Sequence, residues 1–333
     1  MKIAFYDTHQ YEKQSFEEAN KIYQNKIDFF DFKLNEKTVS TCCGYDGVCV
    51  FVNDTLNDIV LQKLAECNVM LVALRCAGFN NVNLEVAKKL GITVVRVPCY
   101  SPSAVAEHAT ALLLALTRKI PQAYIRTKSG NFTLDGLTGR NLKGLTAGII
   151  GTGKIGKETA RIFSGLGMKI ILYDVKSDQE WAIKNSFEYT SLKELLSVSD
   201  VISLHCPLTD ETKHIINRHS LELTKPDAIL INTSRGALIE TSALVEALKH
   251  KRIGGAALDV YEEESKFFFS NWSENIITDD ILIRLLTFPN VIITSHQAFL
   301  TKEALEEIAK TSLQNIHDYE TGIQPENSVF KFY

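Results

Sequence analysis

A glycine pattern directly after an apolar run is the feature that most restricts how this 333-residue chain folds. Gly151–Gly156 reads Gly-Thr-Gly-Lys-Ile-Gly, follows the apolar run Thr146–Ile150 and precedes a helical pattern. Glycines at this spacing permit a tight turn, close approach of a ligand to the backbone, and close packing of helix on strand. Glycine-rich turns are common, but this position between strand and helix favours a dinucleotide-binding βαβ unit.

An acidic residue at the end of the next strand indicates which dinucleotide is bound. The predicted strand Lys169–Tyr173 is followed by Asp174, which lies 18 residues after Gly156. A carboxylate here accepts hydrogen bonds from the ribose hydroxyls of NAD and repels the 2′-phosphate of NADP. The sequence therefore predicts NAD as cofactor, with a solvated strand-end aspartate as the alternative.

Strand-like and helix-like runs alternate along the chain in two series. This alternation predicts parallel sheets with helices on their faces, and six strands with crossover helices are what a doubly wound dinucleotide-binding fold requires. The expected strands are Lys2–Tyr6, Gly47–Val52, Val69–Leu74 and Thr93–Val97 in the first series, and Thr146–Ile150, Lys169–Tyr173, Val201–Leu204, Ala228–Asn232, Gly255–Leu258 and Val291–Thr294 in the second.

The connections between the two series predict how the domains are arranged. Pro98 and Pro102 separate the series, and we expect Ser103 to cap a long helix, Ala104–Arg118. A last helix, Lys302–Tyr319, comes too late for the second sheet and is expected to pack on the first domain. The prediction is an α/β protein of two Rossmann-like or flavodoxin-like domains with doubly wound parallel sheets. An NAD-binding domain of residues 101–299 is inserted in a substrate-binding domain of residues 1–100 plus 300–333, with a ligand cleft between them.

Composition excludes several other classes of protein. The net charge is −4 and no long Lys/Arg run is visible, so we expect no nucleic-acid partner. No apolar stretch approaches the roughly 20 residues of a membrane span. The N-terminal segment reads as a strand and not as a signal peptide, which predicts a cytoplasmic protein.

The seven cysteines lie mostly in apolar surroundings. An odd number without a regular framework fits a reducing cytosol in which thiols act as small core residues. Cys42, Cys43 and Cys49 form a cluster, but no CxxC pair or His-rich partner accompanies it. We therefore expect no metal site.

Three polar residues each follow a different strand of the second series. Arg235, Glu264 and His296 come after the predicted strands Ala228–Asn232, Gly255–Leu258 and Val291–Thr294, on the edge where ligands bind in such sheets. Reduction of a 2-keto acid needs a hydride, a proton for the developing alkoxide and an anchor for the carboxylate. Histidine supplies the proton, a neighbouring carboxylate orients the imidazole, and arginine binds the anion. The joint placement predicts a catalytic set.

At these residues the sequence resembles the D-isomer-specific 2-hydroxyacid dehydrogenase family, over essentially the whole chain. Within the family, the stretch from Phe268 to Phe299 is similar to the D-lactate dehydrogenase branch, because serine precedes His296 and Gln-Ala follows it. The motifs that carry the resemblance are Gly151–Gly156 with Asp174, Ser101–His108, Ile231–Gly236, Leu258–Glu264 and Ser295–Phe299.

The resemblance implies a role for each matching residue. Arg235 would bind the substrate carboxylate and carbonyl, Glu264 would be the partner of the histidine, and His296 would be the acid/base. Thr212 stands where relatives often have Asn, and Asn83 replaces an Asp common in the substrate loop. The implied substrate contacts are Gly78, Phe79, Tyr100, Arg235 and Phe299, and the implied cofactor contacts are Gly151, Gly153, Ile155, Gly156, Asp174, Cys206, Pro207, Thr212, Thr233, Ser234 and Asp259.

The implied activity is the reversible, NAD-dependent reduction of pyruvate to D-lactate by a homodimer. Aromatic walls at Tyr100 and Phe299 favour a methyl-sized side chain, but they also suit branched or aromatic keto acids. A D-2-hydroxyisocaproate-type enzyme, another D-2-hydroxyacid dehydrogenase or a D-lactate supplier for modified cell-wall precursors is therefore an alternative. From another class, a non-catalytic NAD-sensing protein like the family's corepressors is disfavoured by the intact catalytic set. A purely structural α/β protein would fail to bind NADH.

Overall fold

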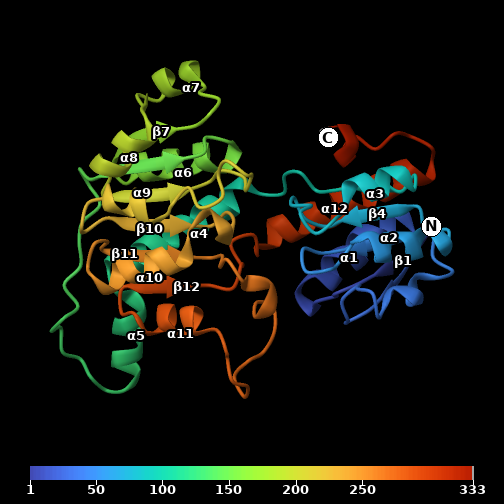
Figure 1. Ribbon diagram of the computed structural model, residues 1–333, viewed down its shortest axis with the longest axis horizontal. Coiled ribbons are helices and arrows are strands. Elements are labelled where there is room, and N and C mark those ends of the chain that lie inside the picture. Colours follow the sequence, from blue (N-terminus) through green and yellow to red (C-terminus); the bar gives the residue numbers. More distant parts are fainter. Residues whose placement is uncertain (332–333) are drawn as a thin grey trace. The chain divides into compact units, whose positions relative to one another are not determined.

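The computed structural model describes residues 1–331, and the chain divides into two compact units (Figure 1). Unit 1 consists of Met1–Ser101 together with the chain from Leu300 onward, and unit 2 is Pro102–Phe299. Each unit contains one parallel sheet. The two-sheet, parallel α/β architecture predicted from the alternation of elements is confirmed.

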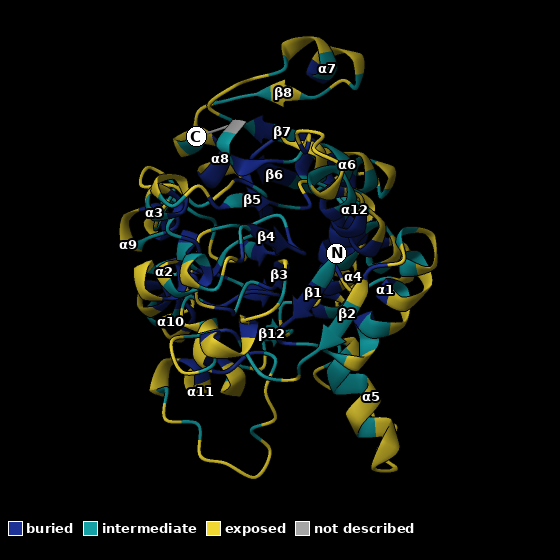
Figure 2. Ribbon diagram, turned by 90° about the vertical axis from the view of Figure 1, so that its right-hand side faces the viewer, coloured by how far each residue is buried: buried dark blue, intermediate teal, exposed yellow. Residues whose placement is uncertain are grey.

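Unit 1 is a five-stranded parallel sheet in the order β2-β1-β3-β4-β5. Every residue of β3 and β4 is buried, which Figure 2 shows as dark blue strands. Continuous apolar runs of this kind are typical of parallel strands covered by helices on both faces. The strands are β1 Lys2–Phe5, β2 Lys26–Phe29, β3 Gly47–Val50, β4 Leu71–Leu74 and β5 Thr93–Val95; the helices are α1 Gln10–Tyr23, η1 Val39–Cys42, α2 Asp58–Glu66, α3 Leu84–Lys89, α12 Lys302–Glu320 and η4 Val329–Lys331.

The C-terminal helix α12 packs against α1 and β4 of this first sheet. Its buried residues include Ala304, Ile308 and Leu313, which recur at helical spacing on one face. Thr301 caps its N-terminus by accepting a hydrogen bond from the Ala304 amide at 3.2 Å. The chain therefore returns to unit 1 after it has completed unit 2.

Unit 2 is a seven-stranded parallel sheet in the order β12-β11-β10-β9-β6-β7-β8. Two separate apolar clusters cover its faces, one including Leu204, Leu230 and Leu258 and the other Ile149 and Ile231. Strand order reverses between β6 and β9, and such a switch point is where dinucleotides bind in doubly wound sheets. The strands are β6 Thr146–Ile150, β7 Lys169–Tyr173, β8 Glu188–Tyr189, β9 Val201–Leu204, β10 Ile229–Asn232, β11 Gly255–Leu258 and β12 Val291–Ile293.

One helix of unit 2 begins at a different residue from the one that the sequence predicts. The long helix α4 begins at Pro102, so Ser103 lies inside its first turn and the predicted Ser103 cap is wrong. Proline is favoured at the first helical position because its missing N–H has no partner to lose there. The helices are α4 Pro102–Thr117, α5 Ile120–Lys128, α6 Lys154–Gly165, α7 Gln179–Lys184, α8 Leu192–Val198, α9 Arg218–Glu222, η2 Gly236–Leu238, α10 Thr241–Lys249, η3 Glu264–Lys266 and α11 Asp280–Thr287.

Two further findings concern membrane-spanning helices and the cysteines. Within residues 1–331, no helix is long and apolar enough to cross a membrane. Cys43 and Cys67 are joined by a disulfide, with their Cα atoms 4.9 Å apart. The expectation that all the cysteines act as core thiols is therefore wrong for this pair, whereas Cys42, Cys49, Cys76, Cys99 and Cys206 form no disulfide within residues 1–331.

Candidate active site

The glycine loop connects β6 to α6 at the switch point of unit 2. Gly151 has a φ of +92°, and a Cβ there would lie 2.4 Å from the Cys206 amide nitrogen. A Cβ at Gly156 would lie 1.9 Å from the Gly151 carbonyl oxygen. Larger residues would force the turn and the helix apart at both positions. At Gly153, which caps α6, a Cβ would meet no protein atom within 4 Å, which leaves room for a pyrophosphate over the helix N-terminus.

Asp174 lies directly after β7 and contacts this loop. Its Oδ2 accepts hydrogen bonds from the Thr152 amide at 2.6 Å and the Thr152 hydroxyl at 3.0 Å, and its Oδ1 accepts one from the Lys176 amide at 2.9 Å. Burial alone would raise the pKa of this carboxyl, but the hydrogen bonds outweigh it and the pKa is lowered. Asp174 is therefore an ionised hydrogen-bond acceptor beside the glycine loop, and its contact with the ribose of NAD stays a prediction.

Most of the other predicted cofactor residues lie on the loops after β9 and β10. The Ser234 hydroxyl donates to the Cys206 carbonyl at 2.7 Å and ties these two loops together. The Thr212 hydroxyl donates to the Pro207 carbonyl at 2.6 Å, so its position is set by the turn that it closes. The buried Thr233 hydroxyl has no hydrogen-bond partner within the described part of the chain. An unpaired buried hydroxyl is costly without a ligand, so this position fits a bound NAD. Ile155 is the second residue of α6.

His296 and Glu264 meet at the carboxyl ends of β12 and β11. The Nδ1 atom of His296 lies 2.8 Å from the Glu264 Oε1 atom, and the two side chains are 18% and 21% exposed. Tyr261 holds the carboxylate from the other side, because its amide donates to Glu264 Oε2 at 3.0 Å. With Nδ1 as the donor to Glu264, the Nε2 atom of His296 is left to exchange a proton with a ligand.

Arg235 follows β10, the neighbour of β11 in the sheet. It is half-buried, and its Nη1 atom donates to the Ser234 carbonyl at 2.7 Å. Asn232 fixes the surrounding turn, since its side chain donates to the Arg235 carbonyl and accepts from the Ser234 amide. Since β10, β11 and β12 are adjacent and parallel, Arg235, Glu264 and His296 all lie at one edge of the sheet.

Asp259 anchors the segment that carries His296. Its carboxylate accepts from the Thr294 hydroxyl at 2.5 Å, the Gln297 amide at 2.9 Å and the Ala298 amide at 2.8 Å. Burial opposes ionisation, but these bonds and one from His108 lower the pKa of Asp259. Its carbonyl also accepts from the His296 amide at 2.7 Å. A direct contact between Asp259 and NAD stays a prediction, whereas its hold on the His296 segment is observed.

His108 is a residue to which the sequence assigned no role. It lies on α4, and its Nε2 atom is 3.1 Å from the Thr294 hydroxyl and 3.4 Å from Asp259 Oδ1. It therefore supports both groups that hold the His296 segment. A histidine in an otherwise Ala/Leu-rich helix was the available signal, but its partners are more than 150 residues away in sequence and no pattern identifies them.

The predicted substrate loop of unit 1 lies after β4. The Cys76 thiol contacts the Gly78 carbonyl at 3.3 Å, and the Arg96 guanidinium donates to the Ala77 carbonyl and lies 5.1 Å from the Phe79 ring centroid. The backbone N–H groups of Gly78 and Phe79 donate to no other residue within 1–331. These two amides are thus available to an anionic ligand, as the sequence resemblance implies.

Three further residues belong to the predicted substrate loop and pocket walls: Asn83, Tyr100 and Phe299. Asn83 still caps α3, since it accepts from the Val86 amide at 3.2 Å, so the exchange from Asp preserves the cap. Tyr100 is half-buried in unit 1, and Phe299 is 7% exposed in unit 2. Their roles as pocket walls stay predictions.

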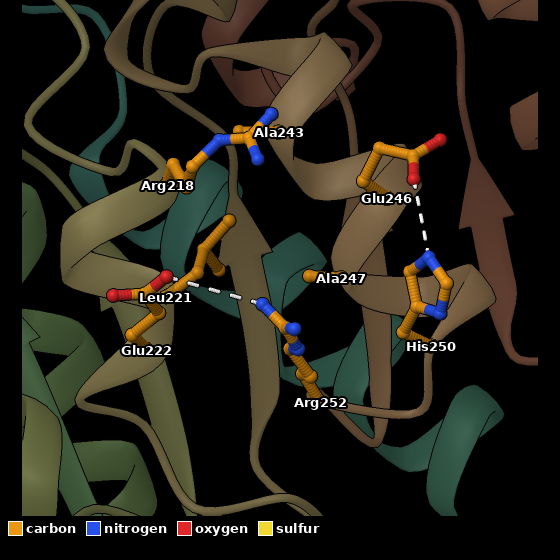
Figure 3. Close-up of a pocket in the computed structure, with 8 residues that line it drawn as sticks. All are labelled: Arg218, Leu221, Glu222, Ala243, Glu246, Ala247, His250 and Arg252. Atoms are coloured by element: carbon orange, nitrogen blue, oxygen red, sulfur yellow. Dashed lines mark ion pairs between the residues drawn. The ribbon is translucent and has the colours of Figure 1, made fainter.

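A small surface pocket of unit 2 lies away from these residues (Figure 3). It is formed by α9, α10 and the segment before β11, and contains the ion pairs Glu222–Arg252 at 3.9 Å and Glu246–His250 at 3.3 Å. Partly exposed pairs of this kind contribute little to stability. None of the predicted site residues lines this pocket, so we do not assign the activity to it.

The parallel sheet, glycine loop and strand-end acid define unit 2 as an NAD-binding domain, and known proteins support the same conclusion. Residues 110–298 match the family model for the D-isomer specific 2-hydroxyacid dehydrogenase NAD-binding domain. The chain is 49% identical to a D-lactate dehydrogenase of Escherichia coli over 97% of this chain and 98% of that protein. It is 42% identical to an aromatic 2-oxoacid reductase of Clostridium sporogenes, over 96% of each.

A solved structure gives the same result for the fold. The apo-structure of D-lactate dehydrogenase from Escherichia coli matches with a TM-score of 0.91 and 46% identity, covering 99% of this chain and 100% of that one. The chain belongs to the D-isomer specific 2-hydroxyacid dehydrogenase family, and it is an NAD-dependent oxidoreductase.

Proposed function

We propose that this protein is a D-lactate dehydrogenase, which reversibly reduces pyruvate to D-lactate with NADH. The observation that carries the proposal is the 2.8 Å contact between His296 Nδ1 and Glu264 Oε1 at the strand ends of the NAD-binding unit. The similarity to the Escherichia coli enzyme supports pyruvate as the substrate.

The residues of the site would divide the chemistry as follows. NADH, when bound, supplies the hydride. His296 donates a proton from Nε2 to the carbonyl oxygen as negative charge develops there, while Glu264 holds the other ring nitrogen and stabilises the imidazolium. Arg235 binds the substrate carboxylate through two N–H groups and supports charge on the reacting oxygen. In the direction of oxidation, Nε2 accepts the hydroxyl proton of D-lactate.

The loop after β4 in unit 1 carries further predicted substrate contacts. The unpaired amides of Gly78 and Phe79 can bind the carboxylate, and Tyr100 and Phe299 would limit the size of the substrate side chain. Bulky aromatic side chains at these two positions favour pyruvate, with its methyl group, over larger keto acids. The similarity to an aromatic 2-oxoacid reductase keeps a larger substrate as the alternative.

The proposal is tested by following NADH oxidation with pyruvate, 2-ketoisocaproate and phenylpyruvate in parallel, with the configuration of each product determined. We expect the highest kcat/KM for pyruvate and a D product. A higher kcat/KM for either larger acid would overturn pyruvate as the substrate and retain the mechanism. NADH binding without turnover of any keto acid would instead favour a non-catalytic NAD-sensing protein.

We further propose that the protein is a homodimer formed through α5 and the segment after it. Exposed apolar side chains gather there, among them Tyr124 at 61%, Ile125 at 65%, Phe132 at 77% and Leu134 at 81% exposure. None of the residues of α5 is buried, as the yellow and teal helix in Figure 2 shows. By contrast, the helix α4 is largely buried and packs on α6. An exposed apolar surface of this kind favours association with a second copy.

Sedimentation velocity tests the dimer directly. The wild-type chain should sediment as a dimer of 37.3 kDa subunits, and Ile125→Glu should shift it toward monomer. Ile183→Glu is a matched control, because Ile183 is 75% exposed on α7. A monomeric wild type, or equal shifts in both variants, would contradict the proposed interface.

A further inference from the structure

Three cysteines that the proposed reaction does not use lie together in unit 1. Cys43 and Cys67 form a disulfide, and the sulfur of Cys42 lies within 4.8 Å of both. Cys42 ends the short helix η1, and Cys67 follows the last residue of α2. We propose that Cys43 and Cys67, beside the buried Cys42, form a thiol redox site in which the Cys43–Cys67 disulfide is reversibly reduced by small-molecule thiols.

The three cysteines differ in solvent exposure, and this difference decides which sulfur an external thiol can reach. Cys43 is exposed, Cys67 is half-buried and Cys42 is buried. Thiol–disulfide exchange requires an attacking thiolate to reach one sulfur of the disulfide, and the Cys43 sulfur offers that access. Burial raises the pKa of Cys42, which keeps it as a protected thiol beside the reactive pair.

The backbone around the disulfide is held by hydrogen bonds that do not depend on it. The Cys43 amide donates to the Ser40 carbonyl at 3.4 Å, and the Asp46 amide donates to the Lys2 carbonyl at 2.8 Å. The Cys67 amide donates to the Lys63 and Leu64 carbonyls, both at 3.1 Å. Reduction would therefore leave the two thiols facing each other across the same helix ends, so the bond can re-form without refolding.

The reaction balances with a small disulfide as the oxidant. The Cys43 and Cys67 thiols lose two protons and two electrons and form one S–S bond, while the S–S bond of oxidised glutathione breaks and its two sulfurs leave as thiols. A mixed disulfide on the exposed Cys43 is the intermediate, and the Cys67 thiolate displaces glutathione from it. The reverse reaction consumes two glutathione thiols.

The site lies on the edge of the unit 1 sheet opposite to the substrate loop. Cys43 precedes β3 and Cys67 precedes β4, whereas Gly78 and Phe79 follow β4. In a parallel sheet these are opposite edges. Oxidation should therefore change the stability of unit 1 and leave turnover unchanged. The disulfide spans 24 positions, and closing a loop of that size restricts the unfolded chain.

The test is a redox titration of the full-length protein in glutathione buffers, read by alkylation and mass spectrometry of the denatured chain. We expect one two-electron transition with a Cys43–Cys67 linked peptide in the wild type, in Cys42→Ser and in the control Cys99→Ser. The transition should be absent from Cys43→Ser and Cys67→Ser. The oxidised wild type should melt about 5 °C above the reduced form, with the same kcat.

Three results would overturn the proposal. The first is no Cys43–Cys67 peptide at any potential. The second is a transition that persists in Cys43→Ser or Cys67→Ser. The third is a stoichiometric zinc ion, retained by the reduced wild type after dialysis and blocking oxidation, because it would identify the three sulfurs as a metal site. None of these results depends on the substrate of the enzyme.

Discussion

His296 has a left-handed backbone conformation, with a φ of 53°. A non-glycine residue in this region carries strain of about 1 kcal/mol or more, which the surrounding structure must offset. Here the His296 amide donates to the Asp259 carbonyl at 2.7 Å. The amides of the next two residues, Gln297 and Ala298, donate to the Asp259 carboxylate. These bonds hold the strained backbone in place, and the imidazole lies against Glu264.

The first prediction concerns this pair of side chains. His296→Gln should lower kcat for pyruvate reduction by about 100- to 10,000-fold, because glutamine cannot transfer the proton. Glu264→Gln should lower it less, since the histidine remains but is no longer stabilised as imidazolium. Stopped-flow turnover combined with NADH fluorescence titration checks both, and NADH affinity should change little. A His296→Gln enzyme with wild-type kcat would exclude His296 as the proton donor.

A second prediction belongs to Asp174. Replacing it with alanine removes the acceptor for the ribose hydroxyls and the charge that repels a 2′-phosphate. The ratio of kcat/KM for NADH to that for NADPH should fall by at least about tenfold, through KM. Thr152→Val is the matched control, because it loses the hydroxyl contact to Asp174 and retains the carboxylate. An unchanged ratio in Asp174→Ala would mean that another group selects the cofactor.

At the scale of elements, His108 on α4 supports the segment after β12. His108→Ala should remove its contacts with Thr294 and Asp259, loosen the His296 segment and lower kcat by about tenfold. His108→Gln can retain one hydrogen bond and should recover most of the loss. The binding constant for NADH should stay constant in both. If His108→Ala leaves kcat unchanged, Asp259 and the backbone hold the segment without it.

The elements differ in how well the sequence reveals them. Strands such as β4 and β10 are short apolar runs next to turn residues, and the predicted ranges contain them. The predictions omitted α1 and β2, because β2 is only partly buried and α1 buries only Glu12 and Phe16, so neither shows a clear apolar period. The two-residue strand β8 offers too little pattern to identify.

The candidate site, too, could be predicted only in part from the sequence. Arg235, Glu264 and His296 could be predicted because each follows a strand, and parallel strands bring such positions to one edge. The support from His108 could not be predicted, because it depends on a contact between α4 and the end of β12. The Cys43–Cys67 bond could not be predicted either, because seven cysteines allow many pairings and spacing does not select one.

At the scale of the whole molecule, His205 couples folding to pH. It follows β9, lies beneath the glycine loop near Gly156, and its Nε2 atom is 2.8 Å from the Ser203 hydroxyl. Burial lowers the pKa of His205 from 6.5 to about 3. The folded state therefore favours the neutral ring. Its contribution to stability is complete above pH 6.5 and is lost as the pH falls from 6.5 toward 3.

We therefore expect the free energy of unfolding to fall by about 1–2 kcal/mol more between pH 6.5 and 5 in the wild type than in His205→Gln. Urea denaturation at the two pH values measures this difference. His250→Gln is the control, since His250 is 59% exposed. A wild-type slope equal to that of His205→Gln would show that His205 is already solvated in the folded protein.

The central claim is that His296 and Arg235 act together on one keto acid. A crystal structure of the protein with NADH and oxamate, an isostere of pyruvate, tests it most directly. We predict that the His296 Nε2 atom lies within about 3 Å of the amide oxygen of oxamate, which takes the place of the keto oxygen of pyruvate. We also predict that Arg235 forms two hydrogen bonds to the analogue. An analogue bound elsewhere, or with His296 turned away from it, would contradict the claim.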